Sequence, residues 1–289
     1  MTPKRHMALI VGFVVGLIVI GSSAGMAASA WDYISVFASG EENPPNMEAQ
    51  FDAIHNLTQM GDAAVGPLLA VMNHENKWVR ANAATALGRI KSADGYAPLV
   101  AALEDEEPDV RASAAEALGW MGDKRAVRPI LLLLESEEDM DLRGATVALG
   151  WLNAADAADE IIALLASESW EVRWRAAIAA GRIGDVDALG QISVLSKDDN
   201  PVVLACAVWA QGELLGTPNY SALKTNLWSL EAGDVYGAAW ALGVIKTEAA
   251  EQILIDTLQT GNDTAKAAAQ SVLHWLDTPR AQMALEMVE

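Results

Sequence analysis

The residues of this sequence with the clearest chemical potential are its tryptophans, and the chemistry that they suit is recognition. The chain has 10 tryptophans among 289 residues. An indole ring buries a large apolar area and keeps one N–H that can donate a hydrogen bond, a combination that is common in binding sites. Five of the ten recur in two columns of positions spaced 31 residues apart. This spacing predicts that they share one surface.

The two columns supply the candidate binding residues. The first runs through Thr85, Glu116, Val147, Ile178, Trp209, Trp240 and Ser271, and the second through Arg89, Trp120, Trp151, Arg182, Glu213, Val244 and Trp275. On a helical wheel of about 100° per residue, both columns point away from the apolar stripe of their helix. We predict that eight of these residues bind a partner: Arg89, Glu116, Trp120, Trp151, Arg182, Trp209, Trp240 and Trp275.

An alternative explanation of these tryptophans requires no partner. A tightly curved array would fold the same rings against one another. Trp78, Trp170 and Trp174 would then belong, with the others, to general filling of the core. Exposed apolar stripes on repeat arrays often mark a partner-binding surface, so both explanations remain open at this stage.

The sequence shows no constellation of catalytic or metal-binding residues. The four histidines, His6, His55, His74 and His274, match no metal-ligand spacing. No strained Gly-x-Ser-x-Gly turn is present. The single cysteine, Cys206, excludes an intramolecular disulfide and is interpreted as a small residue between helices. We predict from this a protein that is not an enzyme and that requires no cofactor or metal.

A repeat of fixed length must position the candidate residues. Leu87-Gly88 recurs at 31-residue intervals, in full or in part, as Leu118-Gly119, Leu149-Gly150, Ala180-Gly181, Gln211-Gly212 and Leu242-Gly243. Pro67, Pro98 and Pro129 keep the same spacing. A fixed period between 20 and 50 residues is the signature of a solenoid, in which each unit buries its apolar face against its neighbours.

Each unit reads as two helices, which we call A and B. In one unit, the A helix is expected over residues 94–104 and the B helix over 109–121, joined by an acidic turn that ends at Pro108. Ser92, Asp123, Asp185, Thr247 and Thr278 form a column of predicted N-cap residues. The spacing predicts seven A–B pairs, preceded by one B helix near residues 48–60 and followed by one A helix near 279–288.

The repeat resembles a known family. The pattern Val79-Arg80, Ala83-Ala84 and Ala86-Leu87-Gly88 returns as Val110-Arg111, Ala114-Ala115 and Ala117-Leu118-Gly119, and again from Val172-Arg173 to Gly184. It is similar to the HEAT-like repeats first associated with phycobilisome lyases. The resemblance implies a right-handed α-solenoid of about seven to eight hairpins over residues 47–289, preceded by an N-terminal apolar helix, with the B helices on the concave side. It also implies that the arginine of each unit bridges neighbouring repeats, although this arginine is missing from the later units.

Residues 1–30 are predicted to lie outside the array. Lys4 and Arg5 precede an uncharged stretch from Met7 to Ala30 that ends in Ala28-Ser29-Ala30. This pattern fits a signal peptide cut after Ala30, and an uncleaved membrane anchor is the alternative. A buried helix of the domain is a third interpretation. Either of the first two places the repeats outside the cytoplasm, with residues 31–46 as a proline-broken linker.

The charge of the chain excludes some partners. The net charge is −20, which argues against binding of nucleic acid or anionic lipid by the array. Two acidic clusters, at residues 104–109 and 135–141, fall in successive A–B turns. We interpret them as solvated turns. A divalent-cation site or a surface for a basic partner is the alternative.

The sequence therefore predicts an exported or membrane-anchored scaffold or adaptor that is not catalytic. Its partner would be an extended protein or peptide segment, or a glycan, held on the concave tryptophan-lined face. The family resemblance suggests an alternative function, that of a bilin lyase or isomerase. A third possibility is a purely structural spacer in an envelope complex.

Overall fold

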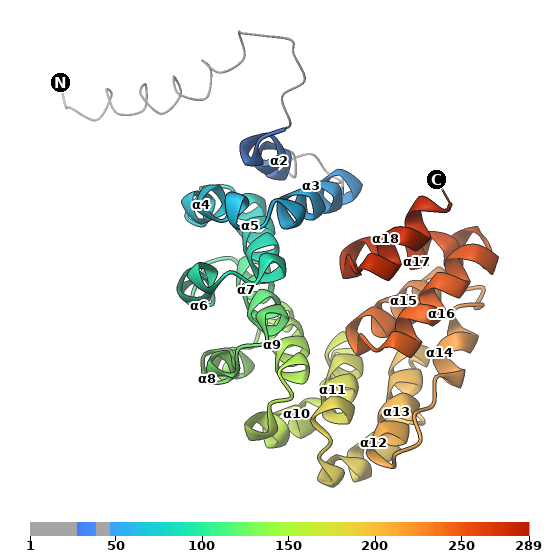
Figure 1. Cartoon of the computed structure of the whole chain (residues 1–289). Coiled ribbons are helices and arrows are strands. Elements are labelled where there is room, and N and C mark those ends of the chain that lie inside the picture. The colour runs from blue at the N-terminus through green and yellow to red at the C-terminus, as the bar shows by residue number, and fades with distance from the viewer. Residues whose placement is uncertain (1–27, 39–46, 289) are drawn as a thin grey trace, which may run out of the picture.

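The structure is a computed structural model that describes residues 28–38 and 47–288 (Figure 1). All regular elements in these two ranges are helical. Within them, no helix is both long and apolar enough to cross a membrane. The predicted signal peptide or anchor lies almost entirely outside the described residues.

The helices alternate between two layers, as the repeat predicts. The B helices are α3 (Met47–Met60), α5 (Lys77–Ile90), α7 (Pro108–Met121), α9 (Asp139–Trp151), α11 (Trp170–Ile183), α13 (Pro201–Leu214), α15 (Ala232–Ile245) and α17 (Asp263–Leu276). The A helices are α4 (Asp62–Val71), α6 (Tyr96–Ala102), α8 (Val127–Leu131), α10 (Ala158–Leu164), α12 (Leu189–Leu195), α14 (Ser221–Asn226), α16 (Glu248–Thr260) and α18 (Pro279–Glu286). The seven predicted A–B pairs, from α4–α5 to α16–α17, are confirmed, with the B helix α3 before them and the A helix α18 after them.

Four of the five predicted N-cap residues accept a capping hydrogen bond. Asp123, Asp185, Thr247 and Thr278 each accept a hydrogen bond from a backbone N–H two or three residues later. Ser92 makes no such bond. In four of the central units, those of α6, α8, α10 and α12, a short 3₁₀ turn accompanies the A helix, so these A helices are shorter than the sequence predicts.

A helix occupies much of the predicted linker. Residues 30–37 form α2 (Ala30–Phe37), and Ile34 and Phe37 are buried against α3, α4 and α5. Ser29 and Asp32 form a capping box at its start. The assignment of residues 31–46 to a linker is therefore wrong for this part. The two prolines that suggested a linker, Pro44 and Pro45, lie outside the described residues.

Glycine in the repeat lets neighbouring B helices touch through their backbones. A Cβ atom built on Gly88 would lie 2.5 Å from the Cα of Ala117, and one built on Gly181 would lie 2.9 Å from the Cα of Ala210. Such distances are far inside van der Waals contact, so no larger residue fits without movement of a helix. The glycines at these positions therefore permit the close packing of neighbouring B helices.

Arginine bridges hold the register of the early repeats, as the resemblance implies. Arg80 donates two hydrogen bonds of 2.8 Å to Asp105 in the next unit, and Arg111 pairs with Asp141 at 2.7 Å. Arg173 pairs in the same way with Asp198 at 2.9 Å. Asp105 and Asp141 belong to the two acidic clusters, so part of each cluster is structural. In later units other contacts span the repeats, such as the hydrogen bond from Asn226 to the Pro201 carbonyl.

The array curls until its ends approach each other. In Figure 1 the B helices lie on the inner side and the A helices on the outer side of the curve. The last B helix, α17, contacts the first, α3, and α15 contacts α11. Since the inner surfaces meet, the concave side is enclosed and is not an open groove.

The glycine column gives a direct test of the helix packing. Gly88→Ala should lower the free energy of unfolding by about 1–3 kcal/mol, because the new methyl group collides with the backbone of α7. Gly190→Ala is the matched control, because this glycine lies exposed in α12 with nothing within 4 Å of the added Cβ. The control should be neutral or stabilising by up to about 1 kcal/mol. Equal effects in urea unfolding would contradict the close approach of α5 and α7.

Candidate functional site

The inner face of the array is closed by side chains that reach across to backbone carbonyls. Arg182 of α11 donates to the carbonyl of Ile245 at 2.6 Å, and Trp151 of α9 donates from Nε1 to the carbonyl of Val244 at 2.9 Å. Arg89 of α5 donates to the carbonyl of Trp275. The accepting carbonyls lie in the last turns of α15 and α17, where no intrahelical partner exists. Each bond therefore satisfies an acceptor that would otherwise be unpaired.

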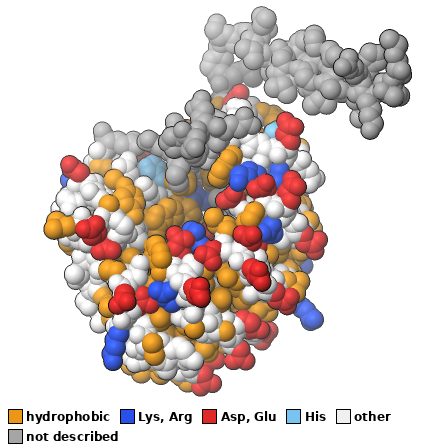
Figure 2. Space-filling view, turned by 180° about the vertical axis from the view of Figure 1, so that it is seen from behind, with side chains coloured by type: hydrophobic (Ala, Val, Ile, Leu, Met, Phe, Trp, Pro, Cys, Tyr) orange, Lys and Arg blue, Asp and Glu red, His pale blue; other side chains and the backbone are white. Residues whose placement is uncertain are grey.

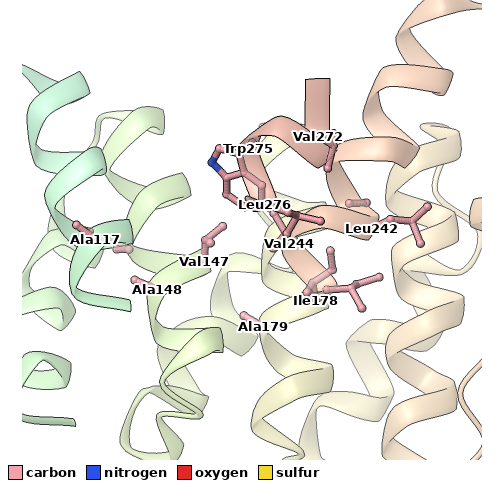
Figure 3. Close-up of a cluster of buried hydrophobic side chains, with 14 of the residues drawn as sticks. Ala117, Val147, Ala148, Ile178, Ala179, Leu242, Val244, Val272, Trp275 and Leu276 are labelled. Carbon is pink, nitrogen blue, oxygen red and sulfur yellow. The ribbon is translucent and has the colours of Figure 1, made fainter. Parts of the chain in front are cut away.

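Four indole rings pack together beside these bonds. The ring centroids of Trp120 and Trp151 are 5.3 Å apart, and those of Trp120 and Trp275 are 5.5 Å apart, both edge to face. Trp275 also lies 5.4 Å from Trp240. Figure 3 shows Trp275 projecting from α17 toward Ala117 and Val147 of the facing helices. Edge-to-face indoles attract one another beyond the area that they bury.

An ion-pair network joins the two ends of the chain. Asp277 follows α17 in a left-handed conformation, with φ at 52°. Its carboxylate lies 2.5 Å from Nδ1 of His55 on α3 and 3.3 Å from Nη1 of Arg89 on α5. Gln282 of α18 donates to the same carboxylate at 2.8 Å. The side chains of Arg89 and Asp277 are 3% and 6% exposed, so this pair is shielded from solvent.

Lys246 also lies among the side chains that close the inner face, which we call the closure. Its Nζ lies 3.3 Å from the ring centroid of Trp120 and 4.8 Å from that of Trp151. Burial, helped by the nearby cations Lys91, Arg182 and Arg89, lowers the pKa of Lys246 to about 7. The two indole faces oppose this effect, because their negative quadrupoles attract the ammonium form.

A cavity remains on the inner side, next to the closed region. Its volume is about 510 Å³, within the range of about 300–1,000 Å³ that is usual for small-molecule sites. Seven aromatic residues line it: Phe51, Trp120, Trp170, Trp174, Tyr236, Trp240 and Trp275. Trp170 and Tyr236 are more than one third exposed and mark its mouth, at the starts of α11 and α15. The face drawn in Figure 2 is hollowed near its centre, where hydrophobic side chains gather. We call this space the central cavity.

Four charged residues line the central cavity. Arg143 forms an ion pair of 2.5 Å with Glu171. Arg175 donates to the Glu171 carbonyl at 2.8 Å and stacks 4.0 Å from the ring of Trp174. Glu116 makes no hydrogen bond or ion pair with any described residue, although Arg175 and Arg143 are near enough to act on its charge. Enclosure raises the pKa of Glu116, and the arginines partly oppose that shift. Enclosure, together with the charge of Arg143, lowers the pKa of Arg175 to about 9.

Unpaired hydrogen-bond donors surround the same space. Asn82 Nδ2 and Arg143 Nε belong to residues that line the central cavity, and neither atom has a partner. Gln50 Nε2 is also unpaired and borders a second cavity of about 330 Å³. Asn82, Ser113 and Glu116 line both cavities, so the two are adjacent. A buried unpaired donor costs free energy, so these atoms favour an acceptor supplied by water or by a ligand.

The structure brings seven of the eight predicted binding residues to this interior. Glu116, Trp120, Trp240 and Trp275 line the central cavity, whereas Arg89, Trp151 and Arg182 form the closure. Trp209 is the exception. It is 1% exposed and packs onto Gly181 between α11 and α13, so it cannot face a partner. The tryptophan-lined concave face predicted from the sequence is not an open surface, because Trp120, Trp151, Trp240 and Trp275 pack against one another across the curl. Binding by the remaining residues stays a prediction.

The sequence prediction missed Arg143, Trp174, Arg175 and Tyr236. All four occupy two further columns of the repeat, one that starts at Ala81 and one that starts at Asn82. The signal was therefore available, because reading these columns at 31-residue steps finds each residue. In the described parts of the chain, no group of three or more His, Cys, Asp or Glu residues is placed to hold a metal ion.

Comparison with protein families identifies the repeat. HEAT repeats match residues 42–118, 65–150, 130–210 and 158–236, and a PBS lyase HEAT-like repeat matches residues 235–260. A search of curated proteins finds no match.

Three solved structures are similar to this chain to different degrees. The complex of CpcE and CpcF of phycocyanin lyase from Nostoc sp. PCC7120 is 22% identical, with a TM-score of 0.56 over 78% of this chain and 94% of that chain. Human deoxyhypusine hydroxylase in complex with glycerol is 17% identical, with a TM-score of 0.38 over 86% and 96%. An engineered protein is 18% identical, with a TM-score of 0.40 over 90% and 82%. The first of these likenesses supports a shared fold.

These comparisons correct the prediction that the chain is not an enzyme. A lyase-type repeat covers residues 235–260, and the fold is shared with a complex of a phycocyanin lyase. The lack of a known catalytic motif in the sequence was therefore too weak a ground for excluding catalysis. A cavity with an enclosed carboxyl and two arginines is also a setting in which side-chain pKa values are shifted, as they often are at functional sites.

Replacing Glu116 with Gln should remove a pH dependence of stability. Because the pKa of Glu116 is raised in the folded protein, its contribution is fully present below the ordinary value of 4.5 and is lost as the pH rises through the folded value. We expect the free energy of unfolding of E116Q, relative to the native chain, to increase from about pH 4.5 to pH 8 in urea titrations. Glu160→Gln at an exposed position is the control for loss of one charge. A difference that stays constant with pH would contradict the enclosure of Glu116.

Proposed function

The chain belongs to the HEAT-repeat family, and from this membership we propose that it is a binding protein that encloses part of its target in the central cavity. The target is a compact group: an aromatic or organic moiety, either free or carried by a partner protein. One observation supports this most: the cavity of about 510 Å³ combines aromatic walls with two arginines and unpaired donors. Aromatic rings supply contact area, and the polar groups fix orientation.

The closure argues for a compact target over an extended one. An extended segment would have to run along the concave face, but Arg182 and Trp151 span that face to reach α15. Displacing these bonds would leave buried carbonyls unpaired, at a cost of about 1–3 kcal/mol each. The extended partner or glycan expected from the sequence is therefore replaced in this proposal by a group that enters at Trp170 and Tyr236.

A lyase-type activity is the second candidate. The segment that matches the PBS lyase HEAT-like repeat, residues 235–260, contributes Tyr236, Trp240 and Val244 to the cavity wall. In this version the bound group is a linear tetrapyrrole, and the cavity holds it for transfer. Titration with biliverdin is a simple test, since enclosure between indole rings would change its visible absorption spectrum. An unchanged spectrum would remove this candidate.

We also propose that the repeats act outside the cytoplasm. The proposal rests on Lys4 and Arg5 before the uncharged stretch of residues 7–30. A C-terminal fusion to a reporter enzyme that is active only after export should be active with the full chain. It should lose activity when residues 7–20 are deleted. An inactive fusion of the full chain would contradict this location.

Filling the cavity should abolish binding without unfolding the protein. Ser113 lines the central cavity from α7, so Ser113→Phe places a ring in the space that a target needs. Ser193→Phe on the outer helix α12 is the matched control, because Ser193 is exposed. With both variants and the native chain as bait, targets of the cavity should be lost from S113F and retained by S193F. A specific partner that is retained by S113F at full level would contradict binding in the cavity.

A further inference from the structure

We propose that the central cavity binds an organic acid with an aromatic body, as its carboxylate anion, between the guanidinium of Arg175 and the carboxyl group of Glu116. This inference rests on the proposed function and adds the charge and chemical class of the target. It assigns distinct roles to two residues that both line the cavity and whose charges interact. Arg175 donates to the bound carboxylate, and Glu116 supplies a second donor from its carboxyl O–H.

The charges that line the cavity support an anionic ligand. Arg143 is neutralised by Glu171 at 2.5 Å. Arg175 forms no ion pair with any described residue, and within the described ranges it donates a hydrogen bond to the backbone carbonyl of Glu171. Arg175 is therefore the cation of the lining that has no ion-pair partner among the described residues. Burying such a charge is costly, and one carboxylate would neutralise it.

The space between Glu116 and Arg175 is suitable for a bridging group. Both side chains line the cavity, yet no ion pair within 4.0 Å joins them, although their charges interact. A carboxylate placed between them could accept from the guanidinium on one side and from the protonated carboxyl on the other. Arginine suits this role, because its planar fork matches the geometry of a carboxylate.

No other charge near Glu116 replaces this arrangement. From α5, Arg89 is already paired with Asp277. From α9 and α11, the facing groups are Arg143, Glu171 and Arg175, described above. The helices α3, α15 and α17 contribute only uncharged residues to the lining.

Two further groups lie outside the lining of the central cavity. Asp109, on the wall of the smaller cavity, is paired with Lys77 at 2.7 Å. From α13, the buried Cys206 thiol lies near Arg175 and burial raises its pKa, so it stays neutral.

The unpaired donors and the aromatic walls indicate which other groups the ligand carries besides its carboxylate. Asn82 Nδ2 and Arg143 Nε are donors without partners, so further acceptor oxygens on the ligand would be satisfied. Trp174, Tyr236 and Trp240 offer ring faces and edges to an aromatic body. The two buried atoms at the cavity that lack a partner are both donors, which favours a ligand with acceptor oxygens.

Binding of the ligand involves the uptake of at most one proton. The ligand enters as a carboxylate, and Glu116 is protonated in the complex. When Glu116 is ionised in the free protein, one proton is taken up from solvent on binding. When it is already protonated, none is taken up. No bond other than this O–H bond is formed or broken.

Three matched probes test the charge of the ligand: 2-naphthoate, its neutral amide 2-naphthamide, and the cation 2-naphthylmethylammonium. Titration calorimetry with the full chain should show 2-naphthoate binding at least about tenfold more tightly than either of the others. If 2-naphthamide binds equally well, the anion inference fails and the cavity proposal stands. If none of the three binds, both fail.

Substitutions then test the roles of the two residues. Arg175→Gln should weaken 2-naphthoate about tenfold to hundredfold and leave 2-naphthamide within about twofold, which also shows that the variant is folded. Arg128→Gln, on the exposed face of α8, should change neither affinity. An Arg175→Gln variant that binds both probes as the native chain does would overturn the role of Arg175.

Glu116→Gln mimics the protonated acid and tests whether Glu116 is protonated in the complex. At pH 5.5 the variant and the native chain should bind 2-naphthoate within about threefold of each other. At higher pH the native chain should bind no more tightly than the variant. A variant that binds more tightly by a constant factor from pH 5.5 to 8.5 would show that Glu116 is ionised in the complex. A variant that binds much more weakly would show that its carboxylate is required. Either result would overturn the proposed role of Glu116.

Discussion

The structure depends on hydrogen bonds that cross the inside of the curl and end on helix C-termini. An α-helix leaves its last carbonyls without intrahelical partners. Here those of α15 and α17 accept from Trp151, Arg182 and Arg89, side chains that lie far away in the sequence. Since water is excluded there, each acceptor needs its donor. These bonds convert an open array into an enclosed one, and the central cavity is the space that remains.

The interior of the molecule differs in charge from the chain as a whole. The chain is strongly acidic, with a net charge of −20, yet its interior is rich in cations. Arg89, Arg175, Arg182 and Lys246 all have pKa values lowered by burial. Indole faces, carbonyls and the carboxylate of Asp277 compensate most of this charge. The compensation is incomplete at Arg175, and this is why the interior favours an anion.

The sequence predicted the helices well and the curvature poorly, for physical reasons. Helix boundaries follow from local signals, such as the proline at Pro108 and the cap at Asp123, and such signals recur along the chain. Curvature is the sum of small rotations between many units, so no single motif determines it. The wheel therefore placed Trp120 and Trp275 on the inner face but could not show that they meet. It also placed Trp209 there, although this ring is buried between neighbouring helices. Arg143 and Arg175 could have been found, because their columns keep the repeat spacing.

The closure is tested most directly by a double-mutant cycle between Arg89 and Asp277. These residues lie at opposite ends of the array, and their side chains approach to 3.3 Å only if the ends meet. The free energy of unfolding would be measured for Arg89→Met, Asp277→Asn and the double variant. We predict a coupling energy of about 1 kcal/mol or more, because each single change leaves a buried charge without its ion-pair partner, whereas the double change removes both charges. A coupling near zero, with both single variants folded, would show that the array is open and would contradict the account of its interior.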